Sequence, residues 1–97
     1  ENVREIMPNT KINPNELFSL LVNQLSAGAW SQLGKTPNPI TGKPEKNLEA
    51  AAVSIGILES LLFKTAGNLN RQEDVLLSDK VRELKLSLVE ESNKRSL

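Results

Sequence analysis

Apolar side chains recur at helical spacing along most of this chain. The first run covers residues 14–33, and its apolar positions, three or four residues apart, are Phe18, Leu21, Val22, Leu25, Ala29 and Leu33. Leu17, Leu20 and Trp30 widen this stripe. The spacing predicts an amphipathic helix that buries one face.

Residues that commonly begin and end helices stand at both ends of this run. Asn13 is a favoured N-cap, Pro14 follows at the first helical position, and Glu16 stands three residues after the cap. Gly34 is expected to end the helix in the left-handed conformation. These signals predict a helix over residues 14–33.

The second run, residues 48–66, is apolar around most of its circumference. Asn47 precedes it as an N-cap and Gly67 follows it. One side carries Val53, Ile57 and Leu61, and another carries Leu48, Ala51, Ala52, Ile55, Leu58 and Leu62. Such a helix is expected to be buried on most of its surface. Its apolar part contains two glutamates and is shorter than a bilayer crossing requires.

The third run, residues 71–91, has a narrower apolar stripe and a charged opposite side. Asn70 and Glu73 form a capping-box pattern at its start. The stripe consists of Leu77, Val81, Leu84 and Leu88. The side expected to face water carries Asp74, Asp79, Lys80, Arg82, Glu83 and Lys85. We expect residues 92–97 to form a frayed tail and residues 1–12 a flexible arm.

Together these runs predict an all-α protein, a three-helix bundle of residues 13–91 with a Pro-rich loop between the first two helices. No short run alternates apolar and polar residues as a strand would. Three helices cannot hide all of the large apolar side chains, so we expect a two-fold homodimer to complete the bundle. Its expected interface contains Leu20, Trp30, Leu62 and Phe63. Gly28 and Gly56 are interpreted as sites of close helix crossing.

The composition leaves little equipment for catalysis. The chain has no Cys and no His, which excludes disulfides and thiolate ligands and removes the commonest general base. Asp79 and Glu83 share a helix face, but a solvated surface explains them better than a cation site. Lys64 follows no Gly-rich loop and is not a phosphate-loop lysine. We therefore expect a non-enzyme with no catalytic residue, metal site or cofactor.

The loop of residues 35–46 is longer than most connections between helices. Its three prolines remove backbone donors, and its glycine permits a tight turn. Helix packing alone does not require the side chains at the middle of this loop. We therefore interpret the following residues as a partner-binding segment: Pro37, Asn38, Pro39, Ile40, Thr41 and Gly42.

Several short segments, in order, resemble a family of short bacterial proteins known as domain of unknown function eighteen forty-four. They are Leu33-Gly34, Pro37-Asn38-Pro39, Thr41-Gly42, Asn47-Leu48, Lys64-Thr65-Ala66-Gly67-Asn68-Leu69 and Glu73. The resemblance covers roughly residues 17–91. It implies a bacterial, helical protein in the cytoplasm and brings no catalytic residue.

The chain departs from the pattern of that family at a few positions. Gly56 stands where an acid is expected, Leu62 and Phe63 stand where charged residues are usual, and Leu88 replaces an aromatic residue. The second helix is therefore more apolar than the family pattern implies. This strengthens the expectation of a partner.

The leading functional hypothesis is a protein–protein interaction or oligomerisation module. An alternative is a small-ligand or anion binder, because Lys35, Lys43 and Lys46 flank the free amides that follow Asn47. Another alternative is an accessory role in an RNA–protein particle through the same loop. Twelve basic and twelve acidic side chains balance, which disfavours nucleic acid as the partner. A leader removed before Glu1 remains compatible with this sequence.

Overall fold

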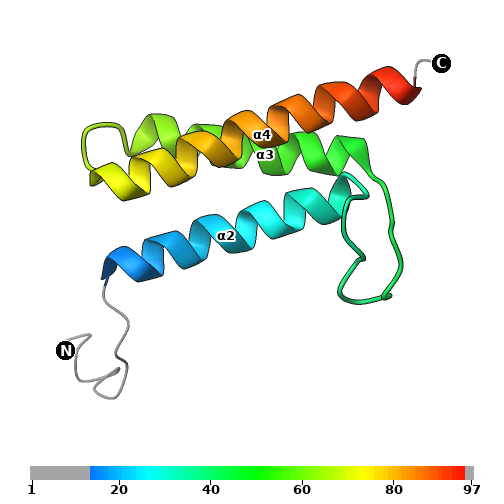
Figure 1. Cartoon of the computed structure of the whole chain (residues 1–97), viewed down its shortest axis with the longest axis horizontal. Coiled ribbons are helices and arrows are strands. Elements are labelled where there is room, and N and C mark those ends of the chain that lie inside the picture. Colours follow the sequence, from blue (N-terminus) through cyan, green and yellow to red (C-terminus); the bar gives the residue numbers. More distant parts are fainter. Residues whose placement is uncertain (1–13, 96–97) are drawn as a thin grey trace.

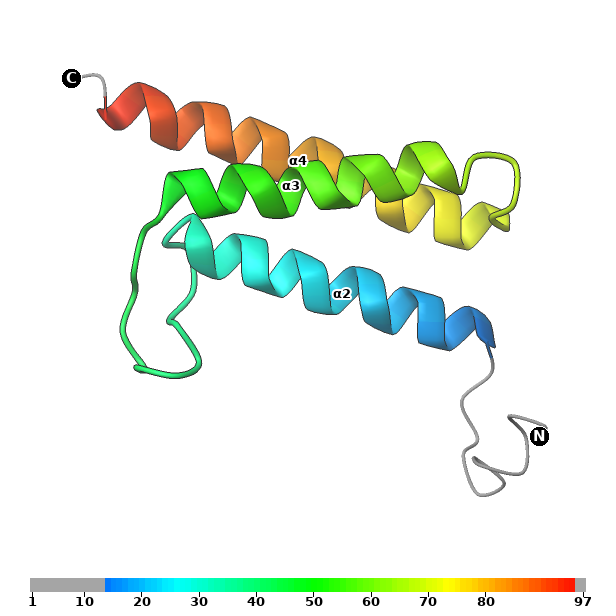
Figure 2. The same cartoon turned by 180° about the vertical axis from the view of Figure 1, so that it is seen from behind.

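The computed structural model describes residues 14–95, and these residues form three helices. They are α2 (Pro14–Gln32), α3 (Leu48–Lys64) and α4 (Arg71–Arg95). Helices α2 and α4 run in one direction and α3 in the opposite one (Figure 1, Figure 2). The helix α2 lies along one side of the α3–α4 pair (Figure 1, Figure 2). The predicted all-α three-helix architecture is confirmed.

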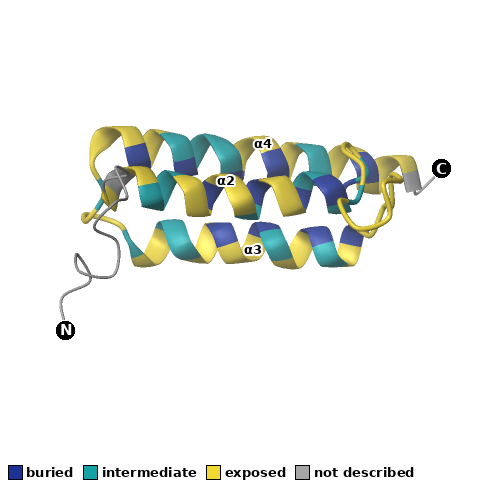
Figure 3. Cartoon of the chain, turned by 90° about the horizontal axis from the view of Figure 1, so that it is seen from below, coloured by how far each residue is buried: buried dark blue, intermediate teal, exposed yellow. Residues whose placement is uncertain are grey.

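The core forms where the apolar stripes of the three helices meet. Its buried members are Val22, Ala29 and Leu33 from α2, Leu48, Ala51, Ile55 and Leu58 from α3, and Leu77, Val81 and Leu84 from α4. Figure 3 shows buried segments in dark blue on all three helices, between exposed segments in yellow. Each fully buried leucine contributes roughly 1.5–3 kcal/mol relative to an exposed one. The predicted stripes therefore supply the whole buried apolar core of residues 14–95.

Side-chain caps begin α3 and α4 as the sequence predicts. The Asn47 Oδ1 accepts a hydrogen bond from the Ala50 N–H at 3.1 Å. At α4, the Glu73 N–H donates to Asn70 Oδ1 at 2.8 Å, and the Asn70 N–H donates to Glu73 Oε1 at 2.9 Å. This is a complete capping box, which satisfies the amides of Asn70 and Glu73 at the start of the helix. The predicted cap Asn13 lies outside the described residues.

Glycine ends α2 in the predicted left-handed conformation. Gly34 has φ +81°, its N–H donates to the Ser31 carbonyl, and the Lys35 N–H donates to the Trp30 carbonyl. These two bonds make a Schellman motif, which satisfies the last carbonyls of the helix. A Cβ added at Gly34 would lie 3.3 Å from Lys46 Cε. The position therefore needs glycine for its φ angle and favours it for the close approach of the loop.

Helix α3 ends two residues before the predicted boundary because Thr65 closes it. The Thr65 N–H and hydroxyl both donate to the Leu61 carbonyl, at 3.0 and 2.7 Å. Gly67 then reverses the chain with φ +85°. At the other end of the bundle, α4 continues through Arg95, so residues 92–95 belong to the helix, beyond the predicted helix end at residue 91. Lys94 donates to Glu91 one turn earlier, which supports this extension.

Two expectations about packing are wrong for the described chain. Helix α3 is buried on one face only: Val53 is 64% exposed and Ile57 is half exposed. Two helices can cover only the stripe that faces them, so the second apolar side of α3 stays at the surface. Gly28 and Gly56 are also exposed, and a Cβ at either would meet nothing within 4 Å. They are not sites of close helix crossing within residues 14–95.

The core model predicts a sharp contrast between two truncations in α3. Leu58→Ala should lower the free energy of unfolding by about 2–5 kcal/mol, because it leaves a cavity between all three helices. Val53→Ala, on the exposed side of the same helix, should change it by less than about 0.5 kcal/mol. Urea titrations followed by circular dichroism measure both values. Equal losses would contradict this assignment of the core.

Candidate interaction surfaces

The loop between α2 and α3 folds into a small hairpin with Ile40 at its tip. An isolated antiparallel bridge joins Pro37 and Pro44, and the Asn38 N–H donates to the Lys43 carbonyl at 2.8 Å. Inside it, the Asn38 side chain accepts from the Ile40 N–H at 2.8 Å. The Ile40 side chain is 91% exposed. A defined turn therefore presents an apolar residue to solvent. Figure 1 shows the loop extending away from one end of the bundle.

Polar side chains brace this hairpin. Gly42, with φ +74°, donates its N–H to the Asn38 carbonyl at 2.7 Å. The Thr41 hydroxyl donates to the Glu45 carboxylate. Its oxygen lies 3.4 Å from the Lys43 nitrogen as an acceptor. Such local side-chain bonds are the usual reason for Asn, Thr and Gly in turns.

The base of the hairpin is fastened to α4 through one buried carboxylate. The side chain of Glu91 is only 4% exposed. Among the described residues it pairs with Lys35 at 2.9 Å, Lys46 at 2.5 Å and Lys94 at 2.9 Å. Lys35 and Lys46 stand on the two sides of the loop, and the Asn47 N–H also donates to the Gln32 carbonyl. The loop thus starts and ends against α2 and α4.

The electrostatics of Glu91 follow from these contacts. Hydrogen bonds from Lys46, then Lys35 and Lys94, hold the pKa of this carboxyl well below its ordinary value of 4.5. The same hydrogen bond raises the pKa of Lys35. Burial opposes both charges but is outweighed by the hydrogen bonds to oppositely charged groups. A buried carboxylate that is paired with three ammonium groups is therefore ionised throughout the neutral range.

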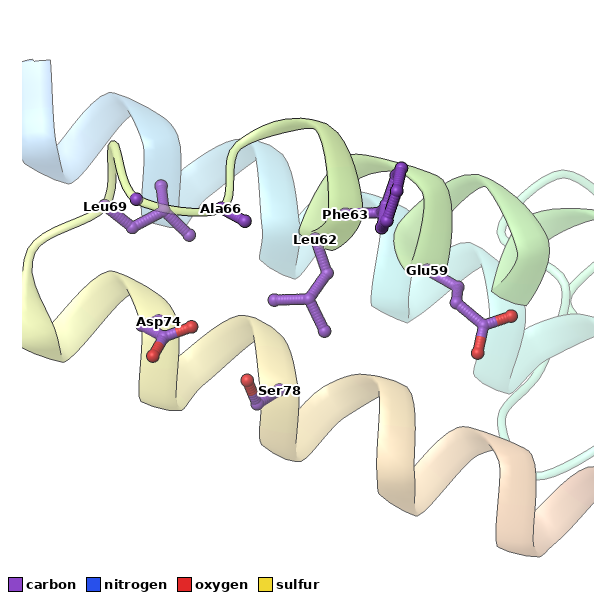
Figure 4. Close-up of a pocket in the computed structure, with 8 residues that line it drawn as sticks. Glu59, Leu62, Phe63, Ala66, Leu69, Asp74 and Ser78 are labelled. Carbon is purple, nitrogen blue, oxygen red and sulfur yellow. The ribbon is translucent and has the colours of Figure 1, made fainter.

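A second surface lies along the groove between α3 and α4, on the side away from α2. A hollow of about 650 Å³ is lined by Glu59, Leu62, Phe63, Ala66, Gly67, Leu69, Asp74 and Ser78. Figure 4 shows Leu62 pointing toward α4, with Asp74 and Ser78 on the opposite wall. Phe63 stands at the outer rim and is 83% exposed. An apolar floor with a carboxylate at each side describes this hollow.

A neighbouring hollow continues along α4. Its lining residues are Ser78, Val81, Arg82, Lys85, Leu86 and Val89, so Ser78 belongs to both hollows. The Lys85 ammonium also donates a hydrogen bond across this groove to the Glu59 carboxylate at 2.5 Å. We call the surface formed by Phe63, Val75, Leu86 and Val89 with the two hollows the α3–α4 face. All four of these apolar side chains are at least half exposed.

The four residues predicted for a dimer interface do not share one surface. Trp30 and Leu62 pack partly buried against the core. Leu20 is about half exposed and lines a separate hollow between α2 and the start of α4. Phe63 belongs to the α3–α4 face. Leu62 also lines the hollow beside Phe63, so these two residues share the α3–α4 face while Leu20 and Trp30 lie elsewhere.

The lysines predicted to attract an anion are differently employed. Lys35 and Lys46 pair with Glu91, as described above, and only Lys43 lies on the hairpin itself. Among residues 14–95, no group of three or more acidic, His or Cys side chains is placed to hold a metal ion. Asp79 forms an ion pair with Arg82 at 2.9 Å, which supports the interpretation of Asp79 as part of a charged surface and not of a cation site with Glu83.

Sequence reasoning missed two features of these surfaces. No feature of the sequence singles out Glu91, because burial of one carboxylate by lysines far away in sequence leaves no local signal. The apolar residues Val75, Leu86 and Val89 were overlooked on the side of α4 expected to be wet. Their spacing from Arg82, seven or four residues, was a usable signal.

Taken together, the fold and these surfaces define a small helical-bundle protein with a braced loop at one end and an exposed apolar face. A model of the family described as domain of unknown function (DUF1844) matches residues 15–90. The chain belongs to this family, which confirms the resemblance drawn from its motifs. Comparisons with curated proteins and with solved structures gave no match. Among the described helices, none combines the length and apolar character needed to cross a membrane.

The ionised, buried Glu91 predicts a specific dependence of stability on pH. Its folded pKa lies below the unfolded value, so the unfolded chain binds the extra proton as the solution is acidified. The stabilisation is present above about pH 4.5 and is lost as the pH falls toward the folded pKa. Glu91→Gln should lower the urea midpoint at pH 7 and flatten its decline below pH 4.5.

The neighbouring Glu90→Gln provides the matched control. The Glu90 side chain is 64% exposed and its oxygen lies 3.8 Å from Lys35, so this change should leave both the midpoint and its pH profile nearly intact. If the two variants behave alike, the three-lysine arrangement around Glu91 does not stabilise the fold.

Proposed function

We propose that this protein is a non-enzymatic interaction module that presents the α3–α4 face to another protein chain in the bacterial cytoplasm. The observation that carries the proposal is the exposure of large apolar side chains beside an already closed core. Phe63, Leu86 and Val89 are each more than half exposed while the ten buried apolar residues are fully packed. A large exposed apolar surface on a folded protein usually marks an interaction site.

The form of the α3–α4 face suits a helix or another convex apolar element. The two hollows share Ser78 and follow the groove between α3 and α4, so together they make an elongated depression with apolar walls. Charged side chains (Glu59, Asp74, Arg82 and Lys85) line the same hollows. An apolar centre with polar edges is the usual anatomy of a protein interface.

The braced hairpin is a second candidate contact of the same module. Ile40 is almost fully exposed, yet its turn is fixed by bonds to Asn38 and by the anchoring of both loop ends at Glu91. Pre-organisation of this kind reduces the conformational entropy lost on binding. This supports Ile40 as an anchor that inserts into an apolar pocket of a partner.

Neither alternative function gains support from the described residues. An anion at the start of α3 would have to compete with Glu91 for Lys35 and Lys46, and the Asn47 side chain already accepts from the Ala50 amide. An RNA partner would find one unpaired lysine on the hairpin, Lys43, together with Glu45. Apolar contact with protein is the better use of this surface.

The proposal predicts that a single change on the α3–α4 face abolishes partner capture without unfolding the protein. Phe63→Ser should lose the proteins that the tagged full chain retains after nuclease treatment and chemical cross-linking. The helical signal should be unchanged, because Phe63 is 83% exposed. Mass spectrometry of the cross-linked material measures the loss.

A change on the opposite side of α3 gives the comparison for that experiment. Ile57→Ser also removes a half-exposed apolar side chain but lies outside both hollows, so it should leave capture intact. Capture that survives Phe63→Ser, or that disappears with nuclease, would count against the α3–α4 face as a protein-binding surface.

The hairpin gives a separate prediction. Ile40→Ala should weaken partner binding roughly tenfold or more if Ile40 occupies a pocket, since truncated anchors typically cost more than 1 kcal/mol. Circular dichroism and the urea midpoint should not change, because the side chain contacts no part of the core. Thr36→Ala, exposed in the same loop but before the hairpin bridge, is the control.

A further inference from the structure

The outer side of α4 carries a seam with coiled-coil spacing. Its positions are Val75, Asp79, Arg82, Leu86, Val89 and Asn93, separated alternately by four and three residues. This is the alternation of a and d positions in a heptad repeat. The buried stripe of the same helix (Leu77, Val81 and Leu84) lies on another side, so the seam is free of the core. It is about 27 Å long at the rise of an α-helix.

An ion pair occupies the middle of this seam. The Arg82 guanidinium lies 2.9 Å from the Asp79 carboxylate within the same chain. The side chains are 66% and 43% exposed, so they are open to another partner. Apolar residues stand on both sides of the pair, with Val75 before it and Leu86 and Val89 after it. Such a polar pair at a seam specifies how two helices can match.

An antiparallel second copy of α4 pairs the four positions from Val75 to Leu86 with one another. With a two-fold axis between residues 80 and 81, Asp79 lies opposite Arg82 of the second copy, and Arg82 lies opposite its Asp79. The same register places Val75 opposite Leu86, in both directions. Antiparallel coiled coils pair a positions with d positions in this way. Opposite charges thus meet at the centre and apolar side chains meet around them.

A parallel arrangement of the same seam fails on charge. It would place Asp79 against Asp79 and Arg82 against Arg82 at the centre of the interface. Like charges in contact oppose association and exclude that register. Asp79 and Arg82 therefore select the direction of the second helix.

We infer that the occupant of the α3–α4 face is a second copy of this chain, packed with its α4 antiparallel along the Val75–Leu86 part of the seam. This inference rests on the proposed function and names its partner. The interface is isologous, since each copy offers the same stripe. The hollow that Phe63 lines shares Ser78 with the hollow lined by Arg82, Leu86 and Val89 of the seam. The neighbouring helix α3 therefore adds area to the contact.

A charge exchange tests the register. Asp79→Arg or Arg82→Asp alone places like charges opposite each other and should raise the dimer dissociation constant roughly tenfold or more, about 1.4 kcal/mol or above. The double variant Asp79→Arg with Arg82→Asp restores opposite charges in both directions and should recover dimerisation. Sedimentation equilibrium of the full chain measures association, and circular dichroism verifies that each variant keeps its helices.

Introduced cysteines test the direction of the helices, and the absence of natural Cys gives a clean background. Val75→Cys combined with Leu86→Cys should form a covalent dimer under mild oxidation. Val75→Cys alone should not, since in the antiparallel register position 75 faces position 86. Efficient cross-linking of Val75→Cys by itself would establish a parallel pairing and overturn the inference.

The apolar part of the seam is tested by Leu86→Ser against Ile57→Ser. Leu86→Ser should abolish the dimer and Ile57→Ser, on the outer side of α3, should preserve it. A chain that stays monomeric across the micromolar range, or whose dimer is lost only with Ile57→Ser, overturns the inference. If the dimer tests fail but Phe63→Ser still loses a captured protein other than this chain, the interaction module keeps its support. The two proposals can therefore fail separately.

Discussion

A helix in a three-helix bundle can bury only the stripe that faces its two neighbours, and this constraint governs the whole molecule. Helices α2, α3 and α4 spend their stripes on a core of ten buried apolar residues. Helix α3 is apolar on more than one side, so Val53, Ile57 and Phe63 are left at the surface. The apolar surplus of the sequence thus becomes an exposed surface.

The contact between Glu91 and three lysines organises the end of the bundle at which the loop between α2 and α3 lies. It joins the C-terminal part of α4 to both sides of the loop, through Lys35 and Lys46. A buried carboxylate is costly unless it is paired, so the lysines and the acid must come together for the loop to keep its place. The hairpin that carries Ile40 is therefore held by a contact outside the hairpin itself.

The sequence predicted the fold well because its helix signals are local. The capping box of Asn70 and Glu73, the cap Asn47 and the glycines after α2 and α3 act within a few residues of one chain segment. The buried stripes were also predictable from period alone. The burial of Glu91 was not, since Lys35 and Lys46 are far from it in sequence and only the assembled bundle brings them together.

The surfaces were harder to predict than the core for a related reason. Periodicity shows which side chains are apolar but not which of two apolar stripes the neighbours will cover, so it does not reveal that Trp30 and Leu62 pack partly buried against the core. On α4 the charged residues hid a second stripe. Asp79 and Arg82 look like a solvated surface when read singly. Between Val75 and Leu86, and paired at 2.9 Å, they instead become the polar centre of a seam whose charges match an antiparallel copy.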